Sequence, residues 1–209
     1  MYKGVKRALD VTFSLIGTVV SSPILLAVAA AVKLDSKGPV IFKQERLGKD
    51  GKVFEMYKFR SMCVGAEHMG TGQYSYKGDS RVTRVGKIIR ATSLDELPQF
   101  INILKGDMSF IGPRPLLCEY LELYTPYQMR RHEVLPGISG LAQVNGRNAI
   151  TWEEKFDYDV YYVDHMSFWL DLRILFKTIK NTLKRADINC SDNNTMEKFR
   201  GTPAAKEKR

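Results

Sequence analysis

Two adjacent carboxylates, Asp95 and Glu96, stand among basic residues in the run Thr92-Ser93-Leu94-Asp95-Glu96-Leu97-Pro98-Gln99. Carboxylates among cations suit metal and phosphate chemistry, because an unscreened phosphate would repel a carboxylate nucleophile. The structural alternative is that Ser93 and Glu96 form a capping box and that both acids only favour the dipole of a helix start. The spacing alone favours the cap, so the rest of the chain has to decide between the two.

The dyad is expected at the start of a helix. A helix is predicted over residues 94–104, where apolar side chains recur every three or four residues. Pro98 is tolerated only in the first turn, which would place Asp95 and Glu96 at the N-terminus. An ionised carboxylate is stabilised there, and phosphate is attracted to the same place. Gly106 is the expected C-cap.

Loops and strands around the dyad carry groups that could bind phosphate, nucleotide or sugar. Gly112-Pro113-Arg114-Pro115 is a stiff turn, and a guanidinium held there can grip phosphate oxygens with two hydrogen bonds. A purely structural turn with an exposed arginine is the alternative. Residues 136–140 and 143–147 form a polar, glycine-rich region that suits a nucleotide or sugar. The candidate substrate-binding residues are Lys58, Arg60, Arg81, Arg90, Arg114, Gln143, Asn145 and Arg147.

Composition narrows the classes of partner. The net charge of +9 calls for an anionic partner or surface. No zinc-spaced Cys/His set or RNP-like strand supports nucleic acid, and we expect none as a partner. A P-loop and a Gly-x-Gly-x-x-Gly run are both absent, which disfavours an ordinary ATPase or Rossmann enzyme. Cys63, Cys118 and Cys190 lie far apart, so no disulfide framework is predicted and a reducing compartment is indicated.

The elements that must position these residues begin with a membrane segment. Residues 11–32 carry no charge and are long enough to cross a bilayer. Pro23 lies midway and should break or kink the helix, while the hydroxyls of Ser21 and Ser22 bond the carbonyls that it frees. Basic residues flank both ends, so charge favours neither orientation. A re-entrant helix-break-helix, with both ends in the cytoplasm, is therefore preferred to a kinked span.

The remaining elements complete an α+β, mainly helical fold. Residues 40–59 read as a β-hairpin that turns at Lys49-Asp50-Gly51. Residues 166–185 place apolar and basic side chains on separate faces, which is typical of an interfacial amphipathic helix. A surface helix packed on a core is the alternative. The predicted organisation is a re-entrant anchor over residues 1–36, a catalytic domain over 37–188 and a polar tail over 189–209.

Taken together, these residues resemble the bacterial sugar transferases, the monotopic polyprenyl-phosphate phosphoglycosyl transferases. The resemblance covers about residues 6–185. Its motifs are Ser22-Pro23, Lys58-Phe59-Arg60-Ser61-Met62, Asp79-Ser80-Arg81-Val82-Thr83, Leu94-Asp95-Glu96-Leu97-Pro98-Gln99, Gly112-Pro113-Arg114-Pro115, Pro136-Gly137-Ile138-Ser139-Gly140 and Gln143-Val144-Asn145-Gly146-Arg147. The chain looks like the minimal catalytic form, without the multi-span N-terminal region of the large members. Its general likeness is greatest to the N,N'-diacetylbacillosamine 1-phosphate transferases of N-glycosylation.

The resemblance implies transfer of a sugar 1-phosphate from a UDP-sugar to undecaprenyl phosphate, with release of UMP. It assigns Asp95 as nucleophile of a covalent phosphosugar intermediate and as ligand of Mg2+, and Glu96 as the supporting acid or base. It implies the cytoplasmic face of the bacterial inner membrane, with membrane lipid and downstream glycosyltransferases as partners. A non-catalytic module that binds anionic lipid and a phosphohydrolase of lipid phosphates are the competing hypotheses.

Overall fold

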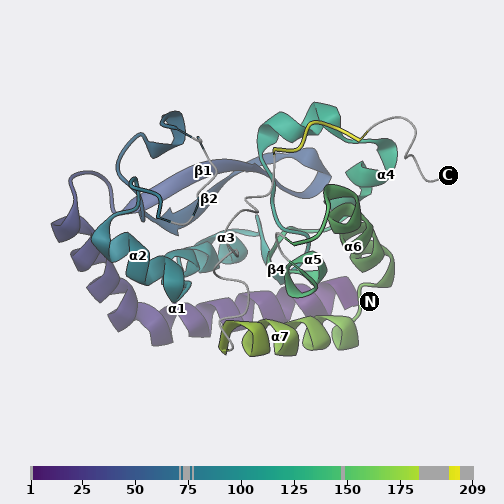
Figure 1. Ribbon diagram of the computed structural model, residues 1–209. Coiled ribbons are helices and arrows are strands. Elements are labelled where there is room, and N and C mark those ends of the chain that lie inside the picture. The colour runs from purple at the N-terminus through teal and green to yellow at the C-terminus, as the bar shows by residue number, and fades with distance from the viewer. Residues whose placement is uncertain are drawn as a thin grey trace.

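The computed structural model describes residues 2–70, 72, 76, 78–146, 149–183 and 198–202. Within them the fold is mainly helical, with two small two-stranded sheets, as Figure 1 shows. The helices are α1 (Tyr2–Asp35), α2 (Arg84–Ala91), α3 (Gln99–Lys105), α4 (Pro126–Met129), α5 (Leu141–Val144), α6 (Trp152–His165) and α7 (Phe168–Leu183). The strands are β1 (Ile41–Leu47), β2 (Val53–Phe59), β3 (Ser109–Ile111) and β4 (Gly137–Ser139). The predicted α+β class is confirmed.

Helix α1 runs along the base of the molecule (Figure 1). Among the described helices it alone is long and apolar enough to cross a membrane, with a mean hydropathy of 2.2 over its best 18 residues. Only 6% of that window is buried. Phe13, Val19, Val20 and Leu26 are all exposed. An apolar surface of this extent needs a partner or a lipid environment.

Pro23 bends α1 without ending it. The helix is continuous from Tyr2 to Asp35, and Figure 1 shows it changing direction between its two halves. Pro23 has no N–H to donate to the carbonyl of Val19. Ser22 Oγ donates to that oxygen instead, at 2.7 Å. The prediction of a kink with serine compensation is confirmed, and the backbone stays helical because the hydroxyl replaces the missing donor.

The N-terminal half of α1 is bonded to α3. Arg7 donates from Nη1 to the carbonyl of Ile103 at 2.6 Å and from Nη2 to that of Leu104 at 3.0 Å. Both carbonyls belong to the last turn of α3, and that of Ile103 also accepts from the N–H of the C-cap residue Gly106. Ser14 Oγ donates to the carbonyl of Phe100 at 2.9 Å. The polar residues of this half therefore anchor the helix to the domain.

The C-terminal half of α1 packs on the same domain through apolar contacts. Val28 and Val32 are buried in one cluster with Phe59 of β2 and Ile89 of α2. A helix held to one domain along both halves cannot cross a bilayer upright while that domain stays on one side. The packing therefore favours the non-spanning anchor over the kinked span.

The β-hairpin is present as predicted. Strands β1 and β2 pair antiparallel, with Ile41 opposite Phe59 and Leu47 opposite Val53. Asp50 adopts a left-handed conformation in the turn, with φ of 56°. Strands β3 and β4 form a second, parallel pair that the sequence analysis missed, since three-residue strands are too short to show alternation.

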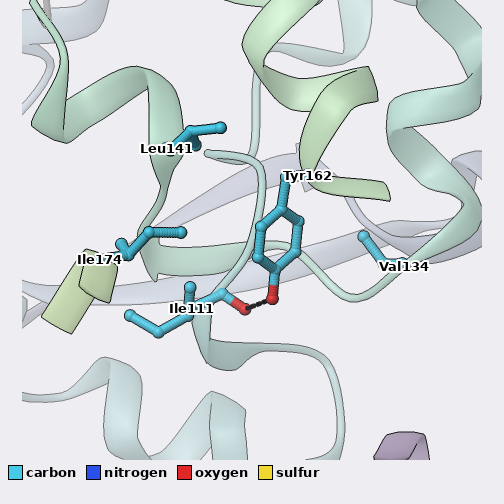
Figure 2. Packing of buried hydrophobic residues seen from close by; sticks show 5 residues of the cluster. All are labelled: Ile111, Val134, Leu141, Tyr162 and Ile174. Atoms are coloured by element: carbon cyan, nitrogen blue, oxygen red, sulfur yellow. Dashed lines mark hydrogen bonds between the residues drawn. The ribbon is translucent and has the colours of Figure 1, made fainter. Parts of the chain in front are cut away.

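A hydrophobic cluster joins the second sheet to α6 and α7. It contains Ile111, Val134, Leu141, Tyr162 and Ile174, shown in Figure 2. The hydroxyl of Tyr162 donates to the carbonyl of Ile111 at 3.2 Å, the dashed line in that figure. Buried tyrosines need such a partner, and this one fixes α6 over the end of β3.

Helix α7 lies beside α1 at the base of the molecule (Figure 1). The two helices are tied by an ion pair from Lys6 Nζ to Asp171 at 2.7 Å. Helix α7 buries Ile174 completely but leaves Trp169 74% and Phe176 63% exposed. A surface helix packed on a core would bury these large side chains. The structure therefore favours the interfacial interpretation, with α1 and α7 sharing one apolar face.

Part of the predicted polar tail, residues 189–209, is packed into the fold. Phe199 is 2% exposed and lies against Tyr120, Trp152 and Phe156. Lys198 pairs with Glu119 at 2.7 Å. Residues 198–202 therefore belong to the domain, while the rest of the tail lies outside the described residues.

Candidate active site

The dyad lies in a single 3-10 turn, η3 (Leu94–Glu96), between α2 and α3. Helix α3 begins at Gln99 with Pro98 as its N-cap, so the helix predicted from residue 94 starts later. Ser93 has φ of 56° and its side chain makes no capping hydrogen bond. The capping-box alternative is therefore wrong. A non-glycine residue in the left-handed region is strained, and such strain gathers at functional sites.

Two cations hold Glu96. Its Oε1 accepts from Arg114 Nη2 at 3.0 Å and from Lys58 Nζ at 3.3 Å. Lys58 comes from β2, so the hairpin and the arginine turn meet at this carboxylate. Burial alone would raise the pKa of Glu96, but Arg114 and Lys58 outweigh it and hold the pKa at about 2. Glu96 is therefore a fixed anion at neutral pH.

Asp95 has a different environment. No hydrogen bond or ion pair within the described part of the chain reaches its half-buried carboxylate. Burial, followed by the charge of Glu96, raises the pKa of Asp95 to about 6, against the opposing pull of Lys58, Arg90 and Arg114. A carboxylate of this pKa is largely ionised at pH 7 and is more basic than an ordinary one.

The two adjacent acids are thus driven apart in pKa, which is how neighbouring carboxylates acquire different tasks. Asp95 is suited to attack or to metal ligation. Glu96, locked between cations, is suited to fixing those cations. Leu94, one residue before the dyad, packs against the cluster that contains Val28 and Val32 of α1. The dyad therefore lies next to the membrane helix.

Backbone contacts with the β4 region support the turn that carries Arg114. Gly112 N donates to the carbonyl of Ser139 at 2.9 Å, and Gly137 N donates to that of Pro113 at 3.0 Å. A Cβ on Gly112 would lie 2.3 Å from the carbonyl oxygen of Leu135. Only glycine permits this approach. Residues 136–140, predicted to bind a nucleotide or sugar, therefore have a structural role in holding the turn of Arg114.

Two of the predicted binding cations are engaged elsewhere. Arg60 is 4% exposed and donates to the carbonyls of Ser36, at 2.8 Å, and Lys37, just beyond the end of α1. Arg81 is 7% exposed and makes a two-pronged pair with Asp79, at 2.9 and 2.6 Å. The structure does not bring either residue to the dyad, because buried guanidinium groups are consumed by carbonyls and carboxylates that close local loops.

In the polar segment 143–147, Gln143 and Asn145 form hydrogen bonds within the protein. Gln143 Nε2 donates to the carbonyl of Ile138 at 3.2 Å, and its buried Oε1 has no partner in the described structure. Asn145 Oδ1 accepts from Lys177 of α7 at 3.0 Å. Arg147 lies outside the described residues. Of the predicted site, the structure thus gathers Lys58, Arg90 and Arg114 around Asp95 and Glu96.

The sequence analysis missed polar residues on α6. Asp159 is 1% exposed and pairs with Arg131, while burial lowers the pKa of Lys155 to about 8. A usable signal was present, because Asp159 follows Phe156 by three residues and Trp152 by seven. An acid on the buried stripe of a helix is expected to have a charged partner.

A divalent cation could be held here only with help from a substrate. Among the described residues, no group of three or more His, Cys, Asp or Glu side chains could ligate a metal. Mg2+ is commonly bound by one or two carboxylates together with substrate phosphates and water. The Asp95 carboxylate, which no described side chain occupies, fits that arrangement. The donor set therefore agrees with a metal bound together with a diphosphate.

Comparison with known proteins places this site in a family. The bacterial sugar transferase family model matches residues 1–185, and the chain belongs to the bacterial sugar transferase family. The resemblance found in the sequence is thereby confirmed. This member of the family has a helical anchor, a half-buried carboxylate dyad and cations that converge on it.

Three relatives show the range of the family. EpsL of Bacillus subtilis (strain 168), described as an uncharacterized sugar transferase, is 48% identical over 94% of this chain and 96% of its own. A UDP-N-acetylgalactosamine-undecaprenyl-phosphate N-acetylgalactosaminephosphotransferase of Aeromonas hydrophila is 47% identical over 88% of this chain. A UDP-glucose:undecaprenyl-phosphate glucose-1-phosphate transferase of Klebsiella pneumoniae is 48% identical over 83%. The aligned regions span 44% and 39% of these two longer proteins.

Proposed function

We propose that this protein transfers a sugar 1-phosphate from a UDP-sugar to undecaprenyl phosphate and releases UMP. The observation that carries the proposal is the asymmetric dyad, with Asp95 raised in pKa to about 6 and unengaged by described side chains, beside Glu96 held by two cations. Relatives of this chain are named for this type of transfer. The exposed apolar face of α1 and α7 suits a lipid-borne acceptor.

The chemistry we propose is a double displacement on one phosphorus atom. A carboxylate oxygen of Asp95 attacks the phosphorus that carries the sugar, the bond to the bridging oxygen breaks, and UMP leaves with that oxygen. A phosphate oxygen of undecaprenyl phosphate then attacks the same phosphorus. The lipid-linked diphosphate sugar forms, and the Asp95 carboxylate is released unchanged.

The surrounding residues would lower the electrostatic barrier to each displacement. Arg114 and Arg90 would face the phosphate oxygens, on which negative charge builds as UMP leaves. Glu96, which also accepts from Lys58, would hold Arg114 in place. Mg2+ bound by Asp95 and the diphosphate would supply charge neutralisation when present. Glu96, whose pKa is about 2, is better suited to this anchoring task than to carrying a proton.

The exposed apolar face of α1 and α7 also suggests how the protein would lie on the membrane. Helices α1 and α7 would lie in the cytoplasmic leaflet of the inner membrane, with the dyad at headgroup level. The product would be the acceptor for downstream glycosyltransferases. The donor sugar is the open part of the proposal: N,N'-diacetylbacillosamine follows from the sequence resemblance, whereas N-acetylgalactosamine and glucose follow from the relatives' names.

A panel experiment tests the proposal. Purified protein in detergent would be incubated with undecaprenyl phosphate and, in turn, UDP-glucose, UDP-N-acetylgalactosamine and UDP-N,N'-diacetylbacillosamine, with UMP as the readout. UMP together with lipid-linked sugar is expected from at least one donor, and the Asp95→Asn variant should give none. Free sugar phosphate without lipid product would point to a phosphohydrolase. Binding to anionic vesicles without any turnover would point to the non-catalytic module.

A further inference from the structure

An ion pair buried behind the site has two side chains almost without exposure. The side chains of Arg131 and Asp159, taken without their backbone atoms, are 1% and 2% exposed, and Nε and Nη2 of Arg131 both reach Asp159 Oδ2, at 3.0 and 2.8 Å. Removing two charges from water is costly, and apolar residues of similar volume often stabilise a fold as well or better. Stabilisation of the fold alone is therefore a weak explanation for the presence of this ion pair.

Arg131 also lies over the rings of Tyr124 and Phe156, and one further hydrogen bond reaches the active-site turn. Nη2 of Arg131 donates to the carbonyl oxygen of Arg114 at 2.7 Å. Together with the contacts of Gly112 and Pro113 to the β4 region, this fixes three consecutive residues of the turn. The side chain of Arg114, 44% exposed, extends from this fixed backbone to Glu96.

Placement of a guanidinium against a carboxylate depends on the backbone that carries it. The hydrogen bond from Arg131 holds the peptide unit after Arg114, and a shift of one ångström in a charged group is enough to weaken a preorganised site. Asp159 of α6 in turn holds Arg131, through the same nitrogen and through Nε. The chain of contacts therefore runs from α6 to the dyad.

We propose that Arg131, held by Asp159, is a positioning residue that keeps the Arg114 guanidinium against Glu96 during phosphosugar transfer. This inference rests on the proposed function. Neither residue touches the dyad, so both act through Arg114. A displaced Arg114 would bind the phosphate oxygens of the UDP-sugar less well, so a raised KM is the measurable signature of the inference.

The test removes both charges of the buried pair. The double variant Arg131→Met/Asp159→Leu should stay folded, since apolar side chains can replace a buried pair. We expect a fall of at least tenfold in kcat/KM for the UDP-sugar and a raised KM. A merely structural pair would instead reduce the amount of active enzyme and leave KM unchanged.

A matched control comes from the neighbouring pair of Arg130 and Asp164, which joins the same two segments but is 38% and 40% exposed. Arg130→Met/Asp164→Leu should keep wild-type kinetics. If the buried double variant does not fold, Asp159→Asn decides. It keeps an acceptor oxygen, which should preserve the fold, but it loses the charge that holds Arg131 and should raise KM. A wild-type KM in the folded variant would overturn the inference. Absence of UMP formation by the wild type would instead count against the proposed function.

Discussion

Arg114 donates to Glu96 across 18 positions of sequence, at 3.0 Å, and Lys58 reaches the same carboxylate oxygen at 3.3 Å. The charge of Glu96 is thereby committed to two cations, whereas Asp95 beside it is not occupied by any described side chain. The different roles of Asp95 and Glu96 follow from this contact. It also makes the electrostatics of the site testable.

Asp95→Asn should abolish activity and stabilise the protein. Because the folded state raises the pKa of Asp95 from 3.8 to about 6, its ionised form costs stability above pH 6. The cost fades as pH falls toward 4, where the folded carboxyl is protonated. At about 1.36 kcal/mol per pKa unit, the gain at pH 7 is at most about 3 kcal/mol. Denaturant unfolding at pH 7 and pH 4 measures it. Asp50→Asn, at an exposed carboxylate in the hairpin turn, is the matched control.

The pH dependence of the reaction should follow Asp95. We expect kcat/KM for the UDP-sugar to fall as pH drops through about 6, because the protonated carboxyl cannot attack. Glu96→Gln should move this limb to lower pH, since a neighbouring negative charge is lost. Lys58→Met should move it to higher pH, since a stabilising cation is lost. Rate profiles of the three proteins provide the measurement, and shifts in the same direction would contradict the assignment.

A covalent intermediate should release UMP before the acceptor is added. With UDP-sugar alone, UMP should appear in an amount no greater than one per active site, and intact mass should show the phosphosugar on the protein. EDTA should abolish the burst and Mg2+ restore it, because the diphosphate and Asp95 carry like charges. A direct displacement would give no UMP until undecaprenyl phosphate is present. Asp95→Asn serves as the control.

The apolar face should control membrane binding. Trp169→Ser and Phe176→Ser remove side chains that are 74% and 63% exposed on α7. Burial of a large apolar side chain is worth about 1.5–3 kcal/mol, so each change should weaken partitioning into vesicles roughly tenfold or more. Flotation with phospholipid vesicles measures this. Val53→Ser, on the exposed hairpin strand, should have no effect, and equal losses for all three would reject the proposed face.

The anchor should keep both ends on one side of the membrane. In sealed vesicles, Lys3 and Lys37 should react with a membrane-impermeant amine reagent from the same side. Pro23→Ala restores the donor to the carbonyl of Val19 and should straighten α1, so that some molecules span the bilayer. Labelling of the two lysines from opposite sides in the wild type would refute the re-entrant arrangement.

Sequence patterns predicted the elements whose signal is local. The hairpin follows from alternation and a turn, and the kink in α1 follows from Pro23 with Ser22. The dyad was found from the types of its residues and their charged surroundings. The left-handed backbone of Ser93, with φ of 56°, could not be predicted from the sequence. Ser93 and Glu96 have the spacing of a capping box, and a 3-10 turn can carry the same spacing.

The functions of individual arginines could not be predicted. Arg60, Arg81 and Arg114 all stand in polar segments, yet only Arg114 reaches the dyad. Whether a guanidinium faces a substrate or a backbone carbonyl depends on contacts between distant segments. The parallel pairing of β3 with β4, which brings residues 137–139 to the arginine turn, is such a contact.

Helix α1 shares a hydrophobic cluster with the rest of the domain, and this determines how the enzyme can be purified. Val28 and Val32 complete the cluster around Phe59 and Ile89, so the membrane helix is one wall of the domain. A chain shortened to begin at residue 36 would leave that cluster open and release the turn that holds Leu94. Such a fragment should aggregate. Solubility must come from detergent or from changes on the outer face of α1, because anchor and domain form one folding unit.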